Sequence, residues 1–379
     1  MNTRPQNMSA RKIRFAVVGL GWIAQEAVLP AFQNVETAEL AALVTNDALK
    51  ANELGKQYNV PRTCSYEEYD DLLRRGEVDA VYISLPNSMH KDYSVRALRA
   101  GVHVLCEKPM AETAEECHEM IRAAEENNVK LMVAYRLHFE PANLRAIEII
   151  RSGEIGEPRI FSSAFCQQVP EGNVRLKKSL GGGPLMDMGV YPINASRYLF
   201  REEPVEVIAF GGNNGEPRFE GIHEMVSAVM RFPGDRLASI TCSFGSADAD
   251  AFEVLGTKGS LRLVPAYDYH TGKTLTVTTG DRTREEKFSQ YDQFGAEIAY
   301  FSGCILEGKD PEPSGREGLA DVRVIQALLR SIRTGSAVRL GPYEREKRPD
   351  QSQAYELPPV HAREIVHAEP PSAVVNLRR

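Results

Sequence analysis

The feature that most constrains the fold is a glycine-rich turn directly after the first apolar run of the chain. Residues Ile13–Val18 run into Gly19–Ala24, which has the pattern G-x-G-x-x-A and opens into a helical stretch. In this pattern the first glycine permits a tight turn, the second lets a phosphate approach the backbone, and the small third residue lets helix pack on strand. The free N–H groups at the start of the helix would then face a pyrophosphate. The pattern predicts a dinucleotide-binding βαβ unit.

The first third of the chain continues this rhythm of short apolar runs and helical stretches. Strands are predicted at Ile13–Val18, Leu40–Val44, Val78–Ser84, Val102–Cys106 and Lys130–Ala134. Their apolarity is continuous rather than alternating, which is typical of a parallel sheet buried on both faces. Helices are predicted at Ser88–Ala100 and Thr113–Asn127, the second opening with a capping-box pattern. We therefore expect an α/β Rossmann domain over residues 1–135.

From about residue 157 strand-like runs follow one another with few helices between them. The predicted strands are Ile160–Cys166, Val205–Gly211, Met225–Phe232, Leu237–Phe244, Ala251–Leu255, Ser260–Val264 and Thr274–Thr278. Turn signals at Phe232–Arg236 and Gly256–Gly259 indicate hairpins. With helices predicted at Gln293–Glu307 and Gly315–Thr334, residues 136–340 should form an α+β domain with a large, mainly antiparallel open sheet. Residues 341–379 are rich in proline and charge and should form an extended or disordered tail.

Composition excludes several classes of protein. A net charge of −7 and the lack of a Lys/Arg-rich stripe argue against nucleic-acid binding. No apolar run reaches the roughly 18 residues that span a bilayer. The six cysteines are scattered singly and the first dozen residues carry no export signal, so we expect a cytoplasmic protein. No spacing of His, Cys and carboxylate residues predicts a metal site.

The end of the second predicted strand bears on which nicotinamide cofactor would bind. An NAD enzyme usually has an Asp or Glu there for the ribose hydroxyls. Here Thr45 and Asn46 follow the strand, and Lys50 comes one helical turn later. An uncharged residue with a nearby cation suits a 2′-phosphate and favours NADP. In the alternative, Asp47 would bind the ribose of NAD and Lys50 would only be solvated.

Two further motifs carry chemistry. Glu107-Lys108-Pro109 ends the fifth predicted strand, at the sheet edge where ligands bind in such folds. In the second domain, Asp187, Tyr191 and Asn194 stand three and four residues apart, so a helical turn would place them on one face.

With these motifs the chain resembles the Gfo/Idh/MocA oxidoreductase family, and most of all its glucose–fructose oxidoreductase and aldose oxidoreductase branch. The resemblance covers about residues 12–340. It rests on the E-K-P signature at 107–109, on D-x-G-x-Y at Asp187–Tyr191, and on the segments Leu85–His90, Tyr135–Pro141 and Gly181–Met186. Many members have a histidine where this chain has Tyr191, and the tyrosine is typical of the branch.

The resemblance implies a catalytic group of three residues. Tyr191 would be the acid/base at the sugar hydroxyl or carbonyl, Lys108 would lie beside it, and Asp187 would orient the sugar. A free phenol titrates near pH 10, so a tyrosine that acts as a base at neutral pH needs a positive neighbour.

The resemblance also implies a set of cofactor-binding residues that follows the dinucleotide from end to end. From the pyrophosphate through the adenosine to the nicotinamide these are Gly19, Leu20, Gly21, Trp22, Ile23, Thr45, Asn46, Lys50, Tyr66, Leu85, Pro86, Asn87, His90, Glu107, Lys108, Arg136 and Arg175. The branch has a tryptophan directly before the arginine that corresponds to Arg175, and this chain has Val174 at that position. His138, His223 and His270 are expected to be structural.

The implied activity is that of an NADP-dependent sugar oxidoreductase, which moves a hydride between C1 of an aldose (pyranose to lactone) and the nicotinamide, and reduces a carbonyl sugar in reverse. Two alternatives stay open. One is a dehydrogenase of xylose, glucose or a trans-dihydrodiol with an exchangeable NAD(P). The other is a non-catalytic NADP or sugar sensor, against which Lys108, Asp187 and Tyr191 argue.

Family members commonly dimerise through the open face of the second sheet, so we expect a homodimer.

Overall fold

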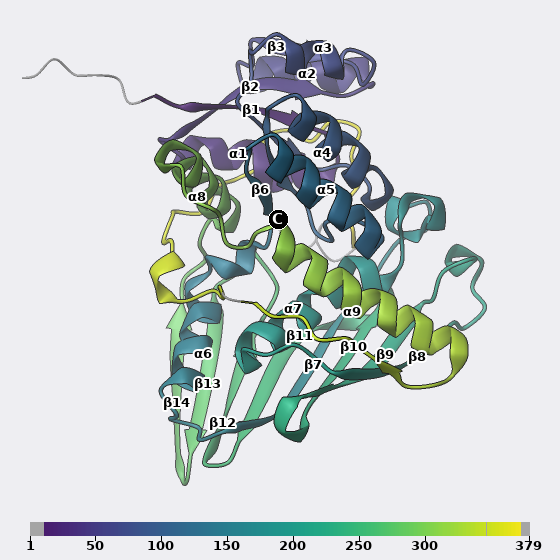
Figure 1. Ribbon diagram of the computed structural model, residues 1–379, viewed down its shortest axis with the longest axis vertical. Coiled ribbons are helices and arrows are strands. Elements are labelled where there is room, and N and C mark those ends of the chain that lie inside the picture. The colour runs from purple at the N-terminus through teal and green to yellow at the C-terminus, as the bar shows by residue number, and fades with distance from the viewer. Residues whose placement is uncertain (1–10, 346, 373–379) are drawn as a thin grey trace, which may run out of the picture.

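The computed structural model of the protein describes residues 11–345 and 347–372, and the predictions for 1–10, 346 and 373–379 lie outside these described residues. Two β-sheets with their helices form an upper and a lower part in the view of Figure 1. The Rossmann unit is above, and the larger second sheet is below. The chain crosses between the two parts several times.

The first sheet confirms the predicted Rossmann fold. Its six strands are all parallel and lie in the order β3-β2-β1-β4-β5-β6. They are β1 (Ile13–Val18), β2 (Ala38–Val44), β3 (Arg62–Cys64), β4 (Ala80–Ile83), β5 (His103–Cys106) and β6 (Leu131–Val133). Strand β3 was not predicted, because its three residues, Arg-Thr-Cys, contain no apolar run.

The helices of this part connect the strands. They are a continuous first helix made of η1 (Ala24–Val28), α1 (Leu29–Ala31) and η2 (Phe32–Asn34), then α2 (Ala48–Gln57), α3 (Tyr69–Arg74), η3 (Asn87–Met89), α4 (His90–Arg99) and α5 (Ala114–Glu126). Helix α5 begins with the predicted capping box, in which the Thr113 side chain accepts from the Glu116 N–H and the Glu116 side chain accepts from the Thr113 N–H.

Successive residues of the strands point to opposite faces of this sheet, and each face has its own helices. Ala16 and Val18 belong to the hydrophobic cluster that includes α3, α4 and α5. Phe15 and Val17 belong to a second cluster, with the first helix and α8 (Gln293–Glu307). Helix α8 follows strand β14 of the second sheet in the chain, yet it lies against the first sheet (Figure 1).

The second sheet has nine strands in the order β14-β13-β12-β11-β7-β10-β9-β8-β15. The strands are β7 (Pro158–Gln168), β8 (Glu206–Gly212), β9 (Met225–Phe232), β10 (Arg236–Ser243), β11 (Gly245–Gly256), β12 (Gly259–Val264), β13 (Lys273–Thr279), β14 (Arg282–Phe288) and β15 (Val338–Arg339). All neighbours are antiparallel except β7 and β10, which confirms a mainly antiparallel sheet. Strand β14 escaped prediction because it is almost entirely polar.

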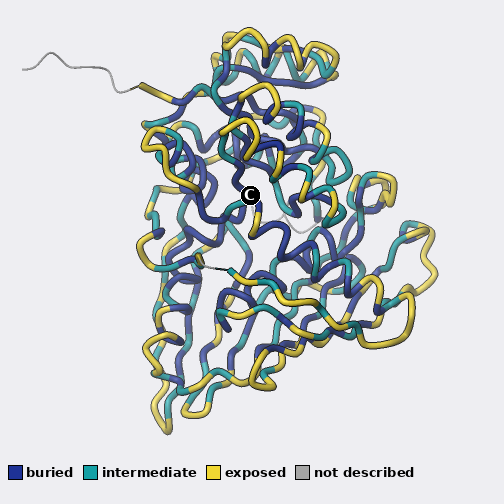
Figure 2. Tube along the Cα trace, viewed as in Figure 1, coloured by how far each residue is buried: buried dark blue, intermediate teal, exposed yellow. Residues whose placement is uncertain are grey.

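Helices cover one face of this sheet and leave the other open. The covering helices are α6 (Pro141–Arg151), α7 (Val190–Phe200) and α9 (Gly315–Thr334). Strand β9 is exposed and buried at alternate residues, as expected for a sheet with one covered face. The exposed strand residues include large hydrophobic side chains, namely Ile160, Phe210, Met225, Val229, Leu237, Leu255 and Val264. In Figure 2 the exposed residues otherwise gather at loops and outer helix faces.

Shorter helical turns complete the fold. They are η4 (Arg136–His138), η5 (Val174–Leu176), η6 (Lys178–Leu180), η7 (Leu185–Gly189), η8 (Pro217–Phe219), η9 (Pro233–Asp235) and η10 (Gln351–Gln353). Among the described residues no helix is long and apolar enough to cross a membrane.

A buried ionic cluster attaches the segment after β15 to the body of the protein. Arg197 of α7 is fully buried and donates to Glu317 of α9 at 2.7 Å and to Glu203 at 2.6 Å. Arg345 pairs with the same Glu317 at 2.9 Å, and Arg348 pairs with Glu203 at 2.8 Å. The described part of the predicted tail is thus extended, apart from η10, and packs on the domains.

Because α8 shares with the first helix the apolar cover of one face of the first sheet, its buried residues should stabilise that sheet. Phe301 is fully buried, with its ring centroid 6.4 Å from that of Phe15. We expect Phe301→Ala to lower the free energy of unfolding by about 3–5 kcal/mol, measured by urea denaturation. The control is Leu306→Ala on the same helix, where 41% exposure predicts a loss below about 1 kcal/mol. Equal effects of the two substitutions would contradict this role of α8.

Candidate functional site

The glycine turn after β1 has the form that a bound pyrophosphate needs. Gly19 has a φ of +89°, and a Cβ there would lie 2.8 Å from the carbonyl oxygen of Ser84, so only glycine fits. A Cβ on Gly21 would meet no atom within 4 Å. The helix starts at Trp22, directly after this open space. The turn therefore leaves a cradle at a helix N-terminus that an anionic group can fill.

A cavity of about 760 Å³ extends from this turn along the carboxyl edge of the first sheet, within the usual size of a cofactor site. Its lining contains Gly19, Leu20, Gly21, Trp22, Ile23, Thr45, Lys50, Tyr66, Ser84, Leu85, Pro86, Asn87, Gly172, Asn173, Val174, Arg175, Leu180, Gly182, Asp187, His367, Ala368 and Glu369. Most of the predicted cofactor residues thus line one continuous space, and the second domain closes its other side.

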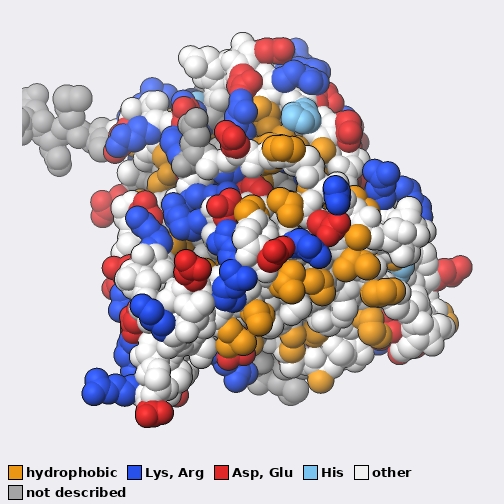
Figure 3. All heavy atoms as spheres, turned by 60° about the horizontal axis from the view of Figure 1, so that its bottom comes forward, with side chains coloured by type: hydrophobic (Ala, Val, Ile, Leu, Met, Phe, Trp, Pro, Cys, Tyr) orange, Lys and Arg blue, Asp and Glu red, His pale blue; other side chains and the backbone are white. Residues whose placement is uncertain are grey.

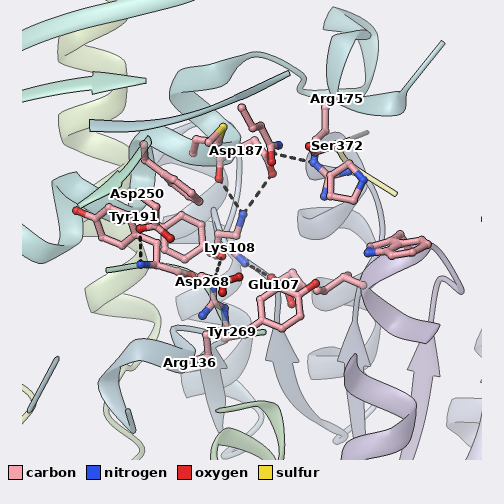
Figure 4. Close-up of a pocket in the computed structure, with 18 of the residues that line it drawn as sticks. Glu107, Lys108, Arg136, Arg175, Asp187, Tyr191, Asp250, Asp268, Tyr269 and Ser372 are labelled. Carbon is pink, nitrogen blue, oxygen red and sulfur yellow. Dashed lines mark hydrogen bonds and ion pairs between the residues drawn. The ribbon is translucent and has the colours of Figure 1, made fainter. Parts of the chain in front are cut away.

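A second cavity, of about 240 Å³, adjoins the first at Trp22, Leu85 and Asn87. Lys108, Arg136, Asp187 and Tyr191 line it, and Figure 4 shows their side chains converging from both domains. The rest of its lining includes His90, Glu107, Phe165, Cys166, Gln167, Arg175, Met188, Asp248, Ala249, Asp250, Tyr267, Asp268, Tyr269, His270, Phe294, Pro371 and Ser372. The predicted catalytic residues lie in this smaller space.

At the far end of the larger cavity the residues after β2 have separate tasks. Lys50 lines the cavity, and partial burial lowers the pKa of its ammonium although Asp47 opposes the shift. Asp47 caps α2 instead, accepting from the N–H groups of Leu49 and Lys50 at 3.0 and 3.1 Å. Asn46 lines neither cavity, and its side chain accepts from the Tyr66 N–H at 2.7 Å. Asn46 therefore positions Tyr66, which does line the cavity.

The Asp187 carboxylate lies between two cations from different parts of the chain. Lys108 Nζ is 3.3 Å from Asp187 Oδ1 and also donates to the Asp187 carbonyl at 2.9 Å. Arg175 Nε donates to Asp187 Oδ2 at 2.8 Å. Although burial opposes ionisation, Arg175 and Lys108 hold the pKa of Asp187 below its ordinary value. Figure 4 draws both ion pairs, of which the Lys108 pair joins the end of β5 to η7 and the Arg175 pair joins η5 to η7.

Tyr191 lies on α7 one turn beyond Asp187, and two cations flank its ring. Lys108 Nζ is 4.8 Å from the ring centroid, while Arg136 Nη2 donates to the Tyr191 hydroxyl at 3.3 Å. The group that donates to the phenol oxygen is therefore Arg136, which was predicted to lie near the nicotinamide. Tyr191 and Asp187 oppose burial and raise the pKa of Lys108, so the ammonium stays charged beside the ring.

Two other predicted cofactor residues have mainly internal partners. The ring nitrogens of His90 lie 2.9 Å from the Pro109 carbonyl oxygen and 2.8 Å from that of Leu85, so His90 ties together two loops at the sheet edge. Glu107 accepts from the Tyr82 hydroxyl at 2.9 Å, and its burial raises its pKa. Both residues also line the smaller cavity.

Asn194 was predicted to share a helix face with Asp187 and Tyr191. It lines neither of the two cavities above, although it lines a separate small cavity with Tyr191 and Lys108. Its side chain amide donates to Glu317 at 2.8 Å and to Asp321 at 2.9 Å, and its oxygen pairs with His138 Nε2 at 2.8 Å. Asn194 belongs to the buried ionic cluster. Asp187 itself lies in the π-helical turn η7, before α7 begins.

The rest of the lining of the smaller cavity is largely aromatic and acidic. The rings of Phe165 and Tyr267 lie 5.4 and 5.8 Å from that of Tyr191. Asp250 accepts from the N–H groups of Ala266 and Tyr267 at 2.8 and 2.7 Å, and burial raises its pKa. Asp248 and Asp268 lie beside it in the lining. Such a wall offers acceptors for hydroxyl groups.

Several lining residues were missed because no local pattern marks them. They lie at the end of β7, in β11 and in the loop 265–270, with His270, which was expected to be structural, among them. The sheet brings these segments together from distant parts of the sequence. Within residues 11–345 and 347–372, no group of three or more His, Cys, Asp or Glu side chains is placed to hold a metal ion.

Comparison with known proteins places the chain in a family. Residues 13–135 match the family described as "Oxidoreductase family, NAD-binding Rossmann fold", and residues 143–262 match the GFO/IDH/MocA C-terminal domain. The chain belongs to the GFO/IDH/MocA family and is an oxidoreductase with an NAD(P)-binding Rossmann domain.

Among its relatives is the D-xylose 1-dehydrogenase [NADP(+)] of Haloarcula marismortui, 34% identical over 342 residues, which cover 88% of this chain and 95% of that one. A crystal structure of aldose–aldose oxidoreductase from Caulobacter crescentus with glycerol matches with a TM-score of 0.83 and 36% identity, over 87% of this chain and 100% of that one. A 3-ketoreductase from Actinomadura kijaniata, solved with NADP and TDP-benzene, matches with a TM-score of 0.78 and 27% identity, over 85% and 98%.

Proposed function

We propose that the protein is an NADP-dependent sugar oxidoreductase that oxidises C1 of an aldose in its pyranose form to the lactone, and in reverse reduces a carbonyl sugar. The observation that carries this proposal is the position of Tyr191. Its hydroxyl, held by Arg136, faces the small cavity where the dinucleotide cavity ends. An aldose–aldose oxidoreductase and a D-xylose 1-dehydrogenase among the similar proteins support the substrate class.

In this reaction the chain supplies position, charge and a proton acceptor. The nicotinamide, when bound, accepts the hydride that leaves C1 with two electrons. Tyr191 takes the proton of the C1 hydroxyl, and the positive charges of Arg136 and Lys108 stabilise the oxygen that gives and receives it. Asp187 holds Lys108 in place over the ring. In the reverse direction the Tyr191 phenol returns the proton to the reduced carbonyl.

The charges of the smaller cavity favour a neutral sugar over a nucleotide-linked or phosphorylated one. Each of its three cations already has a partner, since Lys108 and Arg175 bind Asp187 and Arg136 binds Tyr191. Asp250 and Asp268 add acceptors to the same lining. A phosphate would meet these carboxylates, whereas sugar hydroxyls would donate to them.

The physiological compartment that fits six free, buried cysteines is the cytoplasm.

The direct test mixes the protein with an aldose and follows the near-ultraviolet absorbance of reduced nicotinamide. We expect Tyr191→Phe to lower kcat by about 100-fold or more, because general acid–base catalysis contributes that much, while NADP still binds. Tyr343→Phe is the control, since the Tyr343 hydroxyl donates to the Arg316 carbonyl outside both cavities. A normal kcat in Tyr191→Phe would overturn the acid/base role.

The same assay separates the alternative functions. Absorbance that appears only after NADP is added indicates a dehydrogenase with exchangeable cofactor. Absorbance that rises without added NADP, and falls when a second carbonyl sugar is mixed in, indicates a retained cofactor and a cycle between two sugars. Binding of NADP without turnover of any aldose would support a sensor.

The preference for NADP rests on the residues after β2. Asp47, the alternative ligand for an NAD ribose, is engaged as the cap of α2, while Lys50 faces the cavity. We expect Lys50→Ala to weaken NADP binding about tenfold by loss of a charge-assisted hydrogen bond and to leave NAD binding nearly unchanged. Fluorescence titration with each cofactor measures this, with Lys56→Ala on the exposed side of α2 as control. Equal losses for NADP and NAD would contradict a 2′-phosphate contact.

We also propose that two copies associate through the open face of the second sheet. That face carries Phe210, 72% exposed, together with Met225 and Val229 of the neighbouring β9. On the face in Figure 3, hydrophobic side chains gather toward the right, and Lys and Arg are interspersed with Asp and Glu. An apolar sheet face of this kind is usually covered.

Sedimentation velocity tests the dimer. We expect the protein to sediment as a dimer and Phe210→Asp to sediment as a monomer, because a charge at the centre of an apolar interface is left without a partner. Leu49→Asp, at an exposed position on α2, should not change the oligomeric state. A monomeric parent protein would refute the proposed interface.

A further inference from the structure

The described end of the chain follows a defined path along the first domain. The Leu357 carbonyl accepts from the Asp292 N–H at 3.0 Å, and the Pro358 carbonyl accepts from the Asn34 side chain at 2.7 Å. Further on, the Arg363 guanidinium lies 4.8 Å from the centre of the Tyr58 ring. These contacts carry the chain past the first helix and α2 toward the dinucleotide cavity.

Gln25 fastens this segment beside the glycine turn. The Gln25 side chain is buried, and it accepts from the Val366 N–H at 2.7 Å and donates to the Val366 carbonyl at 2.9 Å. The same amide nitrogen donates to the Leu20 carbonyl at 2.9 Å. One side chain thus joins residue 366 to the turn where a pyrophosphate would lie.

The next residues form part of the cavity wall. His367 Nδ1 lies 3.0 Å from Asp47 Oδ2, and His367, Ala368 and Glu369 line the cavity together with Lys50. His367 has a φ of +47°, which is uncommon for a residue other than glycine. The pair with Asp47 and the bonds of Val366 hold it in this conformation.

Beyond the cavity the segment reaches the second domain. The Asn173 side chain donates to the Pro370 carbonyl at 3.3 Å, and Pro371 and Ser372 line the smaller cavity. Residues 366–372 therefore run beside both cavities, from the adenosine end to the catalytic end. They connect the Rossmann domain to the loop that holds Arg175.

We propose that residues 360–372 are a clasp that forms part of the cofactor site and must open for the cofactor to enter or leave. The proposal rests on the proposed function, since it assigns the larger cavity to a nicotinamide dinucleotide. About 760 Å³ of space remains beneath the clasp, so it can close over a bound cofactor. Exchange of the cofactor then requires breaking the Gln25–Val366 and Asp47–His367 contacts.

Residues 341–372 lie outside both matched family regions. The clasp is therefore argued from the contacts of this chain and not from the family match.

The rate at which NADPH leaves the protein tests the clasp without any sugar. Trp22 is the only tryptophan of the chain and lines both cavities, so its energy transfer to NADPH reports bound cofactor. NADPH is displaced by excess NADP in the full chain and in a variant that ends at Pro359, which keeps the contacts of Leu357 and Pro358. We expect the shortened protein to release NADPH about tenfold faster or more. Release within twofold of the full chain would overturn the proposal.

Point variants keep the test decisive if the shortened chain does not fold. His367→Ala and Asp47→Asn should each speed the release of NADPH by about threefold. The double variant should release NADPH no faster than either single variant, because both substitutions break the same contact between His367 and Asp47. His361→Ala, at an exposed position that lines neither cavity, is the control and should not change the rate. Unchanged release in His367→Ala and Asp47→Asn would likewise refute the clasp. If NADPH does not bind to the full chain, both the proposed function and the clasp are overturned. If NADPH binds but leaves the full chain and the variants at equal rates, only the clasp is overturned.

Discussion

The site depends on one ion pair between the two domains. Lys108 comes from the end of β5 in the first sheet, Asp187 from η7 at the start of the helical layer over the second sheet, and both are largely buried. A buried charge that loses its partner is strongly destabilising, so each residue requires the other. Arg175 completes the arrangement from the loop after β7. This contact holds the carboxyl edge of the first sheet next to the start of α7. As a result, Tyr191 of α7 lies in the lining of the smaller cavity.

The arrangement also separates binding from chemistry. The larger cavity is built mainly from backbone turns and from side chains of the first domain, which suit a long anionic molecule lying along a sheet edge. The smaller cavity is built from side chains of both domains, and its lining contains both cations and carboxylates. The rings of Phe165, Tyr191 and Tyr267 pack against one another in the same lining. A ring with several hydroxyl groups would meet both acceptors and donors there.

Local sequence patterns predicted the parts of the site that depend on neighbours in the chain. The glycine turn, the lysine after β5 and the Asp187–Tyr191 spacing all lie within a few residues, and the structure brings them to the two adjoining cavities. What sequence could not show are contacts between distant residues. The bond from Arg136 to Tyr191 joins positions 55 residues apart, and the pair of Asp47 with His367 joins positions 320 apart. Likewise, the covering of the first sheet by α8 follows from packing that no single helix pattern records.

That covering by α8 has a consequence for how the protein is made. The strands of the Rossmann sheet are complete by residue 133, yet Phe294, Ile298 and Phe301, which help to bury one of its faces, belong to a helix that follows all but the last strand of the second sheet. A growing chain on the ribosome therefore keeps that apolar face without its full cover while the second domain is synthesised. A fragment ending near residue 135 would hold every strand of the dinucleotide domain and still lack part of the cover on one face. That cover is complete only when a helix made late in translation folds back onto the sheet.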